Sequence, residues 1–188
     1  MRKWMIAAAA MALLGACNQL TGGGEPPLPP VQSGAQAPTQ LPPAPSVQQA
    51  NVTQQVRQGL EQQMTQLLDG YQGQFAQGDQ RVQGLNDEIK AMQPGTDHRW
   101  RVSLQANTAY TFLGACDGDC HNVDIELIDM RTGGVVASDM LPDDYPVVNF
   151  TPAANGDYMA RIILQNCTTA PCYTGMRALQ QPAGGGGK

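Results

Sequence analysis

The sequence contains few of the side chains from which active sites are built. It has only two histidines, no Gly-x-Ser-x-Gly nucleophile motif and no glycine-rich phosphate loop. Asp143 and Asp144 are neighbours in a turn flanked by prolines, so nothing makes them face one substrate as the carboxylate pairs of glycosidases do. His98 is expected to be a structural histidine at a strand edge beside Trp100. We therefore expect a protein that is not an enzyme, with no catalytic residues and no cofactor.

Basic residues are also scarce: the chain has 11 Lys and Arg against 16 Asp and Glu. If residues 1–16, which include Arg2 and Lys3, are removed, nine basic residues remain and the net charge is −7. Nucleic acids and anionic lipid surfaces both attract clustered Lys and Arg. The charge balance thus argues against nucleic acid as a partner, and against a membrane held by surface charge.

The N-terminal apolar run is too short to span a membrane. It extends from Trp4 to Leu14, whereas a spanning helix needs about 20 apolar residues. Arg2 and Lys3 precede the run and small residues follow it, a pattern typical of a secretory signal peptide. The sequence predicts a signal peptide over residues 1–16.

The signal peptide ends on a cysteine. The string Leu14-Gly15-Ala16-Cys17 resembles the lipobox of bacterial lipoproteins, which implies that Cys17 is diacylated and becomes the N-terminus. The expected location is the cell envelope, on the outer membrane and facing the periplasm, although Asn18 gives no clear retention signal and the choice of membrane stays open. The alternative is a secreted protein cut near Ala16 with Cys17 free.

Residues 17–49 are rich in Pro, Gly, Gln and Ser, as in "GGGEPPLPP" and "LPPAPS". Such a segment has too little apolar surface to order itself. We expect a disordered tether of mixed polyproline and flexible character.

Residues 50–93 have a different pattern, in which apolar side chains recur every three or four positions and predict an amphipathic helix. Asn51 is the expected N-cap and Pro94-Gly95 the expected end. Several glycines weaken the helix, so a break or hinge near Gly70–Gly78 is expected. The apolar stripe either packs on the following domain, which the period near 3.6 favours, or pairs with another copy.

Residues 97–179 alternate apolar and polar side chains in short runs separated by turn signals such as Ala154-Asn155-Gly156-Asp157. Seven or eight strands of this kind predict a mainly β domain, an antiparallel, jelly-roll-like β-sandwich. Residues 180–188 are expected to form a flexible tail.

The same region carries a resemblance. The strand "VDIEL", the "GGVVASD" hairpin and Gly156-Asp157-Tyr158 are similar to the bacterial pre-peptidase C-terminal type of domain. The resemblance implies a β-sandwich linked to secretion, substrate binding or adhesion rather than to chemistry. Some domains of this type resemble calcium-binding modules.

Four cysteines form two close pairs, Cys116 with Cys120 and Cys167 with Cys172. Together with His121 they could bind zinc, but an exported protein meets an oxidising compartment, which favours disulfides. Four cysteines allow three connectivities. We prefer the two local pairings because each pair lies in a loop that follows a strand. Neither pair has the Cys-x-x-Cys spacing of redox sites.

Aspartates surround the first cysteine pair and offer oxygen ligands for calcium. The candidates are Asp117, Asp119 and Asp124, with Asp139, Asp143 and Asp144 further along. An EF-hand is excluded because Asn122 stands where its glycine should be, so a solvated acidic loop with no metal is favoured. The expected function is a non-catalytic interaction module for an envelope protein or glycan. The alternative is a calcium-dependent glycan-binding or protease-accessory domain.

Overall fold

The computed structural model describes residues 24–41 and 43–182. The expected signal peptide and the expected lipidation site, Cys17, lie outside the described residues, as does most of the expected tail. Gln180, the first residue of that tail, still belongs to a strand. Within the described ranges no helix is both long and apolar enough to cross a membrane.

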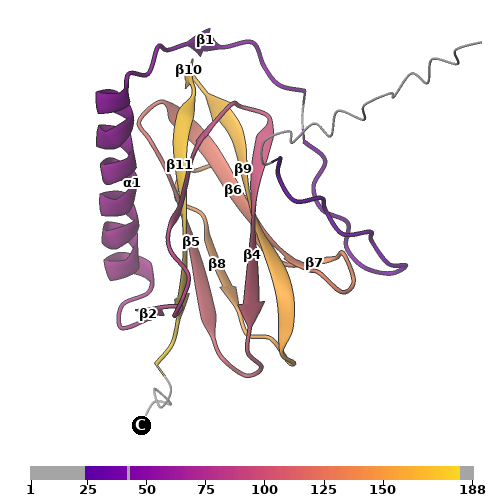
Figure 1. Cartoon of the computed structure of the whole chain (residues 1–188). Coiled ribbons are helices and arrows are strands. Elements are labelled where there is room, and N and C mark those ends of the chain that lie inside the picture. Colours follow the sequence, from indigo (N-terminus) through magenta and orange to yellow (C-terminus); the bar gives the residue numbers. More distant parts are fainter. Residues whose placement is uncertain (1–23, 42, 183–188) are drawn as a thin grey trace, which may run out of the picture.

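Two antiparallel sheets stack on one another, as predicted for residues 97–179 (Figure 1). In one sheet, called the β5 sheet, the strands lie in the order β11, β5, β8. The short strands β2 and β3 both pair with the other edge of β11, one after the other along its length. The β9 sheet has the order β4, β9, β6, β7. A short parallel pair joins β1 to β10. The strands are β1 (Gln48–Gln49), β2 (Gln80–Arg81), β3 (Glu88–Met92), β4 (Thr96–Leu104), β5 (Tyr110–Cys116), β6 (Cys120–Asp129), β7 (Val135–Asp139), β8 (Val147–Phe150), β9 (Gly156–Cys167), β10 (Thr169–Ala170) and β11 (Cys172–Gln180).

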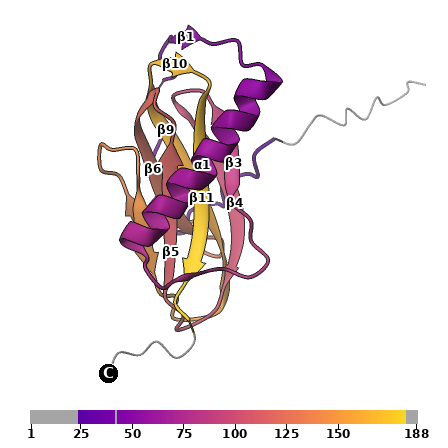
Figure 2. The same ribbon diagram turned by 90° about the vertical axis from the view of Figure 1, so that its left-hand side faces the viewer.

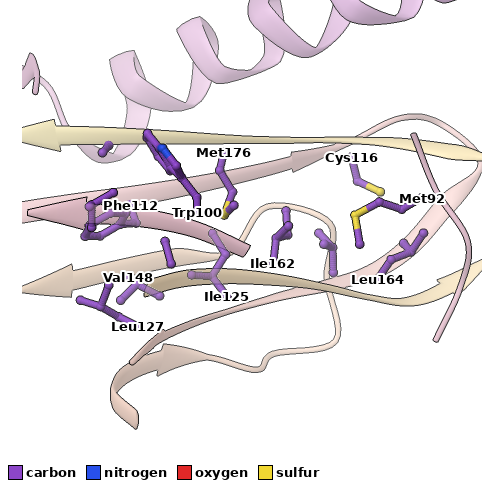
Figure 3. Packing of buried hydrophobic residues seen from close by; sticks show 14 of the residues in the cluster. Met92, Trp100, Phe112, Cys116, Ile125, Leu127, Val148, Ile162, Leu164 and Met176 are labelled. Carbon is purple, nitrogen blue, oxygen red and sulfur yellow. The ribbon is translucent and has the colours of Figure 1, made fainter. Parts of the chain in front are cut away.

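The main core lies between the two sheets. Alternate side chains of a strand point to opposite faces, and the inward set includes Trp100, Phe112, Ile125 and Ile162, each at most 9% exposed. Figure 3 shows these side chains between the sheets, with the helix outside. The mainly β, antiparallel architecture expected from the alternating pattern is confirmed.

One helix covers the outer face of the β5 sheet (Figure 2). Helix α1 is Gln54–Phe75, and its N-cap is Thr53, whose side chain accepts the Val56 N–H. Met64 and Leu68 are fully buried against β5 and β11. Packing on the same chain is thus the arrangement found, rather than pairing through this face with another copy.

The prediction of helix over residues 50–93 was wrong beyond Phe75. The chain leaves the helix before Gly78, which adopts a positive φ of 91°, a conformation that glycine tolerates. Residues Glu88–Met92 then form β3 along β11. The break expected near Gly70–Gly78 is found here, since the helix runs through Gly70 and Gly73 and ends at Phe75.

The prediction of a disordered tether was also wrong for the part that the structure describes. Residues 24–41, here called the strap, lie along the outer face of the β9 sheet (Figure 1). The Val135 N–H donates to the Gln36 carbonyl at 2.9 Å, and the Gln32 N–H donates to the Thr132 carbonyl at 2.8 Å. The strap therefore hydrogen-bonds to the β6–β7 hairpin, and its composition alone did not reveal these partners.

Candidate functional site

The two disulfides lie side by side at one end of the sandwich. Cys116 bonds to Cys120 and Cys167 to Cys172, with Cα separations of 5.9 and 6.4 Å. Cys120 pairs with Cys167 across β6 and β9, and all four sulfurs belong to the main core. The preferred pairing is confirmed. Because the thiols of both pairs are oxidised, neither pair offers a thiolate for zinc.

The aspartates between Cys116 and Cys120 tie loops together. Asp117 is buried, and its Oδ2 accepts the Tyr173 N–H at 2.6 Å while its Oδ1 accepts the Asp119 N–H. Burial raises the pKa of Asp117 although these hydrogen bonds oppose the shift. Asp119 accepts the Thr168 hydroxyl at 3.1 Å. Both carboxylates are therefore used in holding the two disulfide loops and β11 together.

Asp124 lies elsewhere, on the outer face of the β9 sheet. Its Oδ2 accepts a hydrogen bond from Gln165 at 2.7 Å, but its Oδ1 is buried without a partner in the described part of the chain, as is the Asn122 Oδ1. Burial raises the pKa of Asp124, and the nearby carboxylates of Asp139 and Glu126 add to the effect. Within residues 24–41 and 43–182, no three His, Cys, Asp or Glu side chains are placed to hold a metal.

Asp124→Asn is expected to stabilise the protein at pH 7 by about 1 kcal/mol, because it removes a buried charge with an unsatisfied oxygen. The pKa of Asp124 is raised on folding, so its ionisation opposes folding. That cost is absent below the pKa of the unfolded chain and grows as pH rises through the folded pKa. Urea unfolding should therefore show the gain at pH 7 and little of it near pH 3.

Asp157→Asn is the control, because Asp157 is exposed on strand β9 of the same sheet, and it should change little at either pH. A bound cation would reverse the result for Asp124. In that case calcium would raise the melting temperature of the unchanged protein but not of Asp124→Asn, and the substitution would lower stability when calcium is present.

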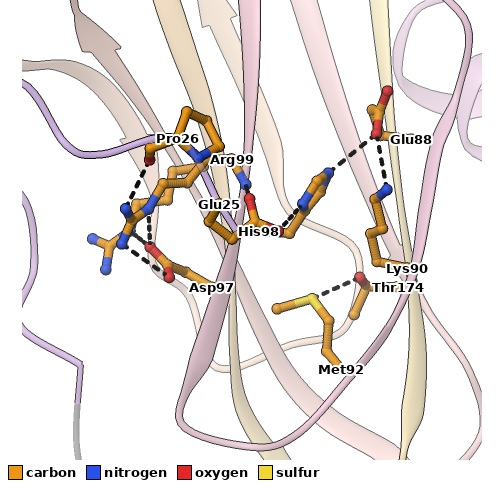
Figure 4. Close-up of polar contacts among 10 residues, drawn as sticks. Glu25, Pro26, Glu88, Lys90, Met92, Asp97, His98, Arg99 and Thr174 are labelled. Atoms are coloured by element: carbon orange, nitrogen blue, oxygen red, sulfur yellow. Dashed lines mark hydrogen bonds and ion pairs between the residues drawn. The ribbon is translucent and has the colours of Figure 1, made fainter. Parts of the chain in front are cut away.

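His98 bridges the strap and both sheets (Figure 4). Its side chain is 9% exposed, and it contacts Glu25 of the strap through Nδ1 at 2.6 Å and Glu88 of β3 through Nε2 at 3.1 Å. The Arg99 N–H donates to the second oxygen of Glu25 at 2.7 Å. His98 is therefore a structural histidine on the edge strand β4, as expected.

A polar hollow of about 520 Å³ lies at the end of the sandwich opposite the disulfides. Asp129 and Asp157 contribute carboxylates to its wall, but Arg131 pairs with Asp129 at 3.3 Å and the Ser103 hydroxyl donates to Asp157 at 2.6 Å. Burial raises the pKa of Tyr158, which also lines it. Since these side chains already have partners, the hollow is a weaker candidate than the surface described next.

Three aromatic rings form an exposed group that we call the aromatic patch: Tyr71 and Phe75 of α1, and Tyr145 of the loop before β8. Their ring centroids are 5.8 to 6.0 Å apart, and Phe75 and Tyr145 are parallel to within 5°. Phe75 is 37% and Tyr145 40% exposed. Leu141, in the same loop as Tyr145, is 62% exposed. Clustered exposed apolar groups of this kind mark interaction sites.

The loop that carries Tyr145 is held in place from several sides. The Val123 N–H donates to the Asp143 carbonyl at 2.9 Å, and the Gly114 N–H donates to the Pro146 carbonyl at 2.8 Å. A Cβ at Gly114 would lie only 2.5 Å from Pro146 Cγ, so glycine is needed for this close approach. The patch is therefore built on a fixed loop rather than on a loose one.

The charges beside the patch are negative. Burial raises the pKa of Tyr71, and the nearby carboxylates of Asp144 and Asp143 raise it further. Asp143 Oδ1 accepts the Tyr145 N–H at 3.2 Å, whereas the Asp144 side chain makes no hydrogen bond or ion pair within the described residues. The patch thus combines exposed ring faces with a free, half-buried carboxylate.

This patch is not predicted from the sequence. Tyr71 and Phe75 belong to the apolar stripe of residues 50–93, and Tyr145 lies 70 residues beyond Phe75. The only local signal is that two aromatic residues four apart end the helix, where they share one face. No protein-family model matches the chain, and comparison with curated proteins gives no significant match.

Proposed function

We propose that this protein is a lipid-anchored envelope lipoprotein whose β-sandwich is a non-catalytic module that binds another macromolecule. The observation that carries the proposal is the aromatic patch, which exposes stacked rings on a fixed loop and a helix end. A monomeric soluble protein rarely leaves clustered aromatic and apolar side chains in water unless they contact a partner. The resemblance to pre-peptidase C-terminal domains, with their jelly-roll-like sandwich and their roles in adhesion and substrate binding, supports the same proposal.

The anchor is proposed from the string Leu14-Gly15-Ala16-Cys17 behind a short apolar run. The docked strap shortens the distance that such an anchor allows between the membrane and the sandwich. Within the described residues, the strap contacts the sandwich from Glu25 onward, and the chain from Cys17 to Glu25 spans at most about 30 Å when fully extended. The docked strap would therefore keep the sandwich close to the membrane, whereas a free tether to residue 49 would let it move much further.

Cys17→Ser is expected to move the protein from the membrane fraction to the soluble periplasmic fraction, because it removes the acyl chains that we propose as the anchor. Fractionation of cells followed by immunoblotting measures this. The neighbouring substitution Asn18→Ser leaves the cysteine intact and should keep the protein in the membrane fraction. Membrane attachment that survives Cys17→Ser would disprove the lipid anchor.

A further inference from the structure

We infer that the aromatic patch, together with Asp144, binds arginine side chains presented by a partner protein. The inference rests on the proposed function of a binding module and adds the chemistry of its partner. It is carried by three features of the described residues: the orientation of the rings, the sign of the neighbouring charges and the rigidity of the support.

The rings offer flat, partly exposed faces. Phe75 and Tyr145 are parallel to within 5° at a centroid distance of 5.8 Å, so they stack on one another and each keeps an outer face that the other does not cover. Tyr71 is tilted by 49° to both and closes one side. A guanidinium group stacks on such faces because it is planar, weakly hydrated and positively charged, while the ring face is negative.

The negative charges beside the aromatic patch favour a positively charged ligand. The carboxylates of Asp144 and Asp143 both act on Tyr71, and the whole chain carries a net charge of −5. Asp144 is half-buried and its carboxylate has no partner in the described part of the chain. Arg177 pairs with Asp87 at 2.7 Å on the same face of the β5 sheet, which shows the kind of contact a guanidinium makes with a carboxylate here. The carboxylate of Asp144 is available for the same contact with a partner's arginine.

Arginine fits this arrangement better than lysine does. Its planar fork can stack on the outer face of one of these rings while two of its N–H groups donate to one carboxylate, whereas an ammonium group is a compact and strongly hydrated point charge. A neutral sugar could also stack on the rings, but it would gain nothing from the negative charge. Preference for arginine and sensitivity to salt are thus the distinguishing properties.

Support for the rings is rigid, so little ordering is needed on binding. Asp139 accepts the Val147 N–H at 2.8 Å and so joins the two ends of the loop, and the Gly114–Pro146 contact fixes the residue next to Tyr145. The helix end that carries Tyr71 and Phe75 is fixed by Leu68, one turn earlier, which is fully buried.

The test is isothermal titration of the full chain in detergent with three peptides, (Gly-Arg)4, (Gly-Lys)4 and (Gly-Glu)4. We expect (Gly-Arg)4 to bind about fivefold more tightly than (Gly-Lys)4, with affinity falling as salt rises, and (Gly-Glu)4 not to bind. Tyr145→Ala and Asp144→Asn should each weaken (Gly-Arg)4 binding about fivefold. Asp144→Asn is nearly isosteric, and melting temperatures show whether either variant is folded.

Val56→Ala is the matched control, because Val56 is 49% exposed on the same helix but lies near its other end. It should leave binding unchanged. Equal affinity for the arginine and lysine peptides, affinity unaffected by Tyr145→Ala, or displacement of the peptide by a neutral glucose tetrasaccharide at every salt concentration would each overturn the inference.

A photoactivatable cross-linker at Leu141 in intact cells separates this inference from the proposed function. If the peptides fail but the cross-linker joins the protein to one defined macromolecule, only the arginine chemistry is wrong. If the peptides fail and the cross-linker joins it to nothing, the binding module itself is wrong.

Discussion

Arg161→Met is expected to lower the free energy of unfolding by about 3–5 kcal/mol, because it leaves buried carboxylates without their cation. Arg161 is 1% exposed on the outer face of the β9 sheet. Its Nη1 donates to Glu126 Oε2 at 2.8 Å and to the Thr39 carbonyl of the strap at 2.8 Å, and its Nε donates to Asp97. Glu126 in turn accepts the Thr39 N–H at 2.9 Å. One guanidinium thus joins two strands and the strap.

Urea unfolding at pH 7 measures the loss, and Arg101→Met is the control because Arg101 is exposed on the same sheet, on β4. Hydrogen exchange at the Thr39 amide should also accelerate in Arg161→Met, since the Thr39 carbonyl loses its donor and Glu126, which accepts the Thr39 N–H, loses its cation. If Arg161→Met costs no more than Arg101→Met, the ion pairs do not contribute to stability and the strap is held by other contacts.

Acid should weaken the same network. Burial opposes ionisation of Asp97, but hydrogen bonds from Arg99 and Arg161 outweigh it and lower its pKa. A carboxyl with a lowered pKa stabilises the fold above its unfolded pKa, and this contribution is lost as pH falls through the folded pKa. The strap and the β9 sheet therefore depend on a charged Asp97 at neutral pH.

The strap could not be predicted from composition because its contacts use groups that composition does not report. Prolines predict an extended chain without internal hydrogen bonds, and that expectation holds for a free tether and for a docked strap alike. In the sandwich, Glu126 and Arg161 lie at the positions of β6 and β9 that point to the outer face of the sheet, where polar side chains normally face water. Only the fold shows that they face each other across β6 and β9 and receive both backbone groups of Thr39.

The boundary between helix and strand was misjudged for a related reason. Ile89 and Met92 are three residues apart, which resembles helical spacing, but in β3 an odd separation places them on opposite faces. Ile89 packs under α1, whereas Met92 enters the core between the sheets. A strand of a sheet that is covered on both faces has apolar residues without strict alternation, so periodicity cannot separate it from a helix.

The disulfides and the two sheets were predictable because their signals are local. Two cysteines that lie four or five residues apart in one loop are close enough to form a disulfide with each other. A strand whose side chains alternate between apolar and polar buries every second one. The aromatic patch has no such signal. Tyr145 meets Phe75 only because the loop before β8 rests on the β5 sheet beside the helix, which is a property of the tertiary structure.

Leu68→Ala is expected to cost about 2–5 kcal/mol, the range for truncating a large buried aliphatic side chain. Leu68 is fully buried between α1 and the β5 sheet, where its Cδ1 lies only 3.1 Å from the position that a Cβ on Gly175 would occupy. Glycine in β11 therefore lets the helix approach closely, and truncating Leu68 to alanine removes the contact between the two. Because Tyr71 follows Leu68 by one turn, the substitution should also loosen the aromatic patch.

Urea unfolding followed by circular dichroism measures the cost, and titration with (Gly-Arg)4 measures the effect on the patch. Val56→Ala removes an exposed side chain of similar size from the same helix and should change stability by less than about 0.5 kcal/mol. The helix adds its apolar face to the sheet rather than folding alone, since an isolated helix of this composition is marginal. A cost below about 1 kcal/mol for Leu68→Ala, or a patch whose peptide affinity is unchanged, would mean that the helix is not held by this contact.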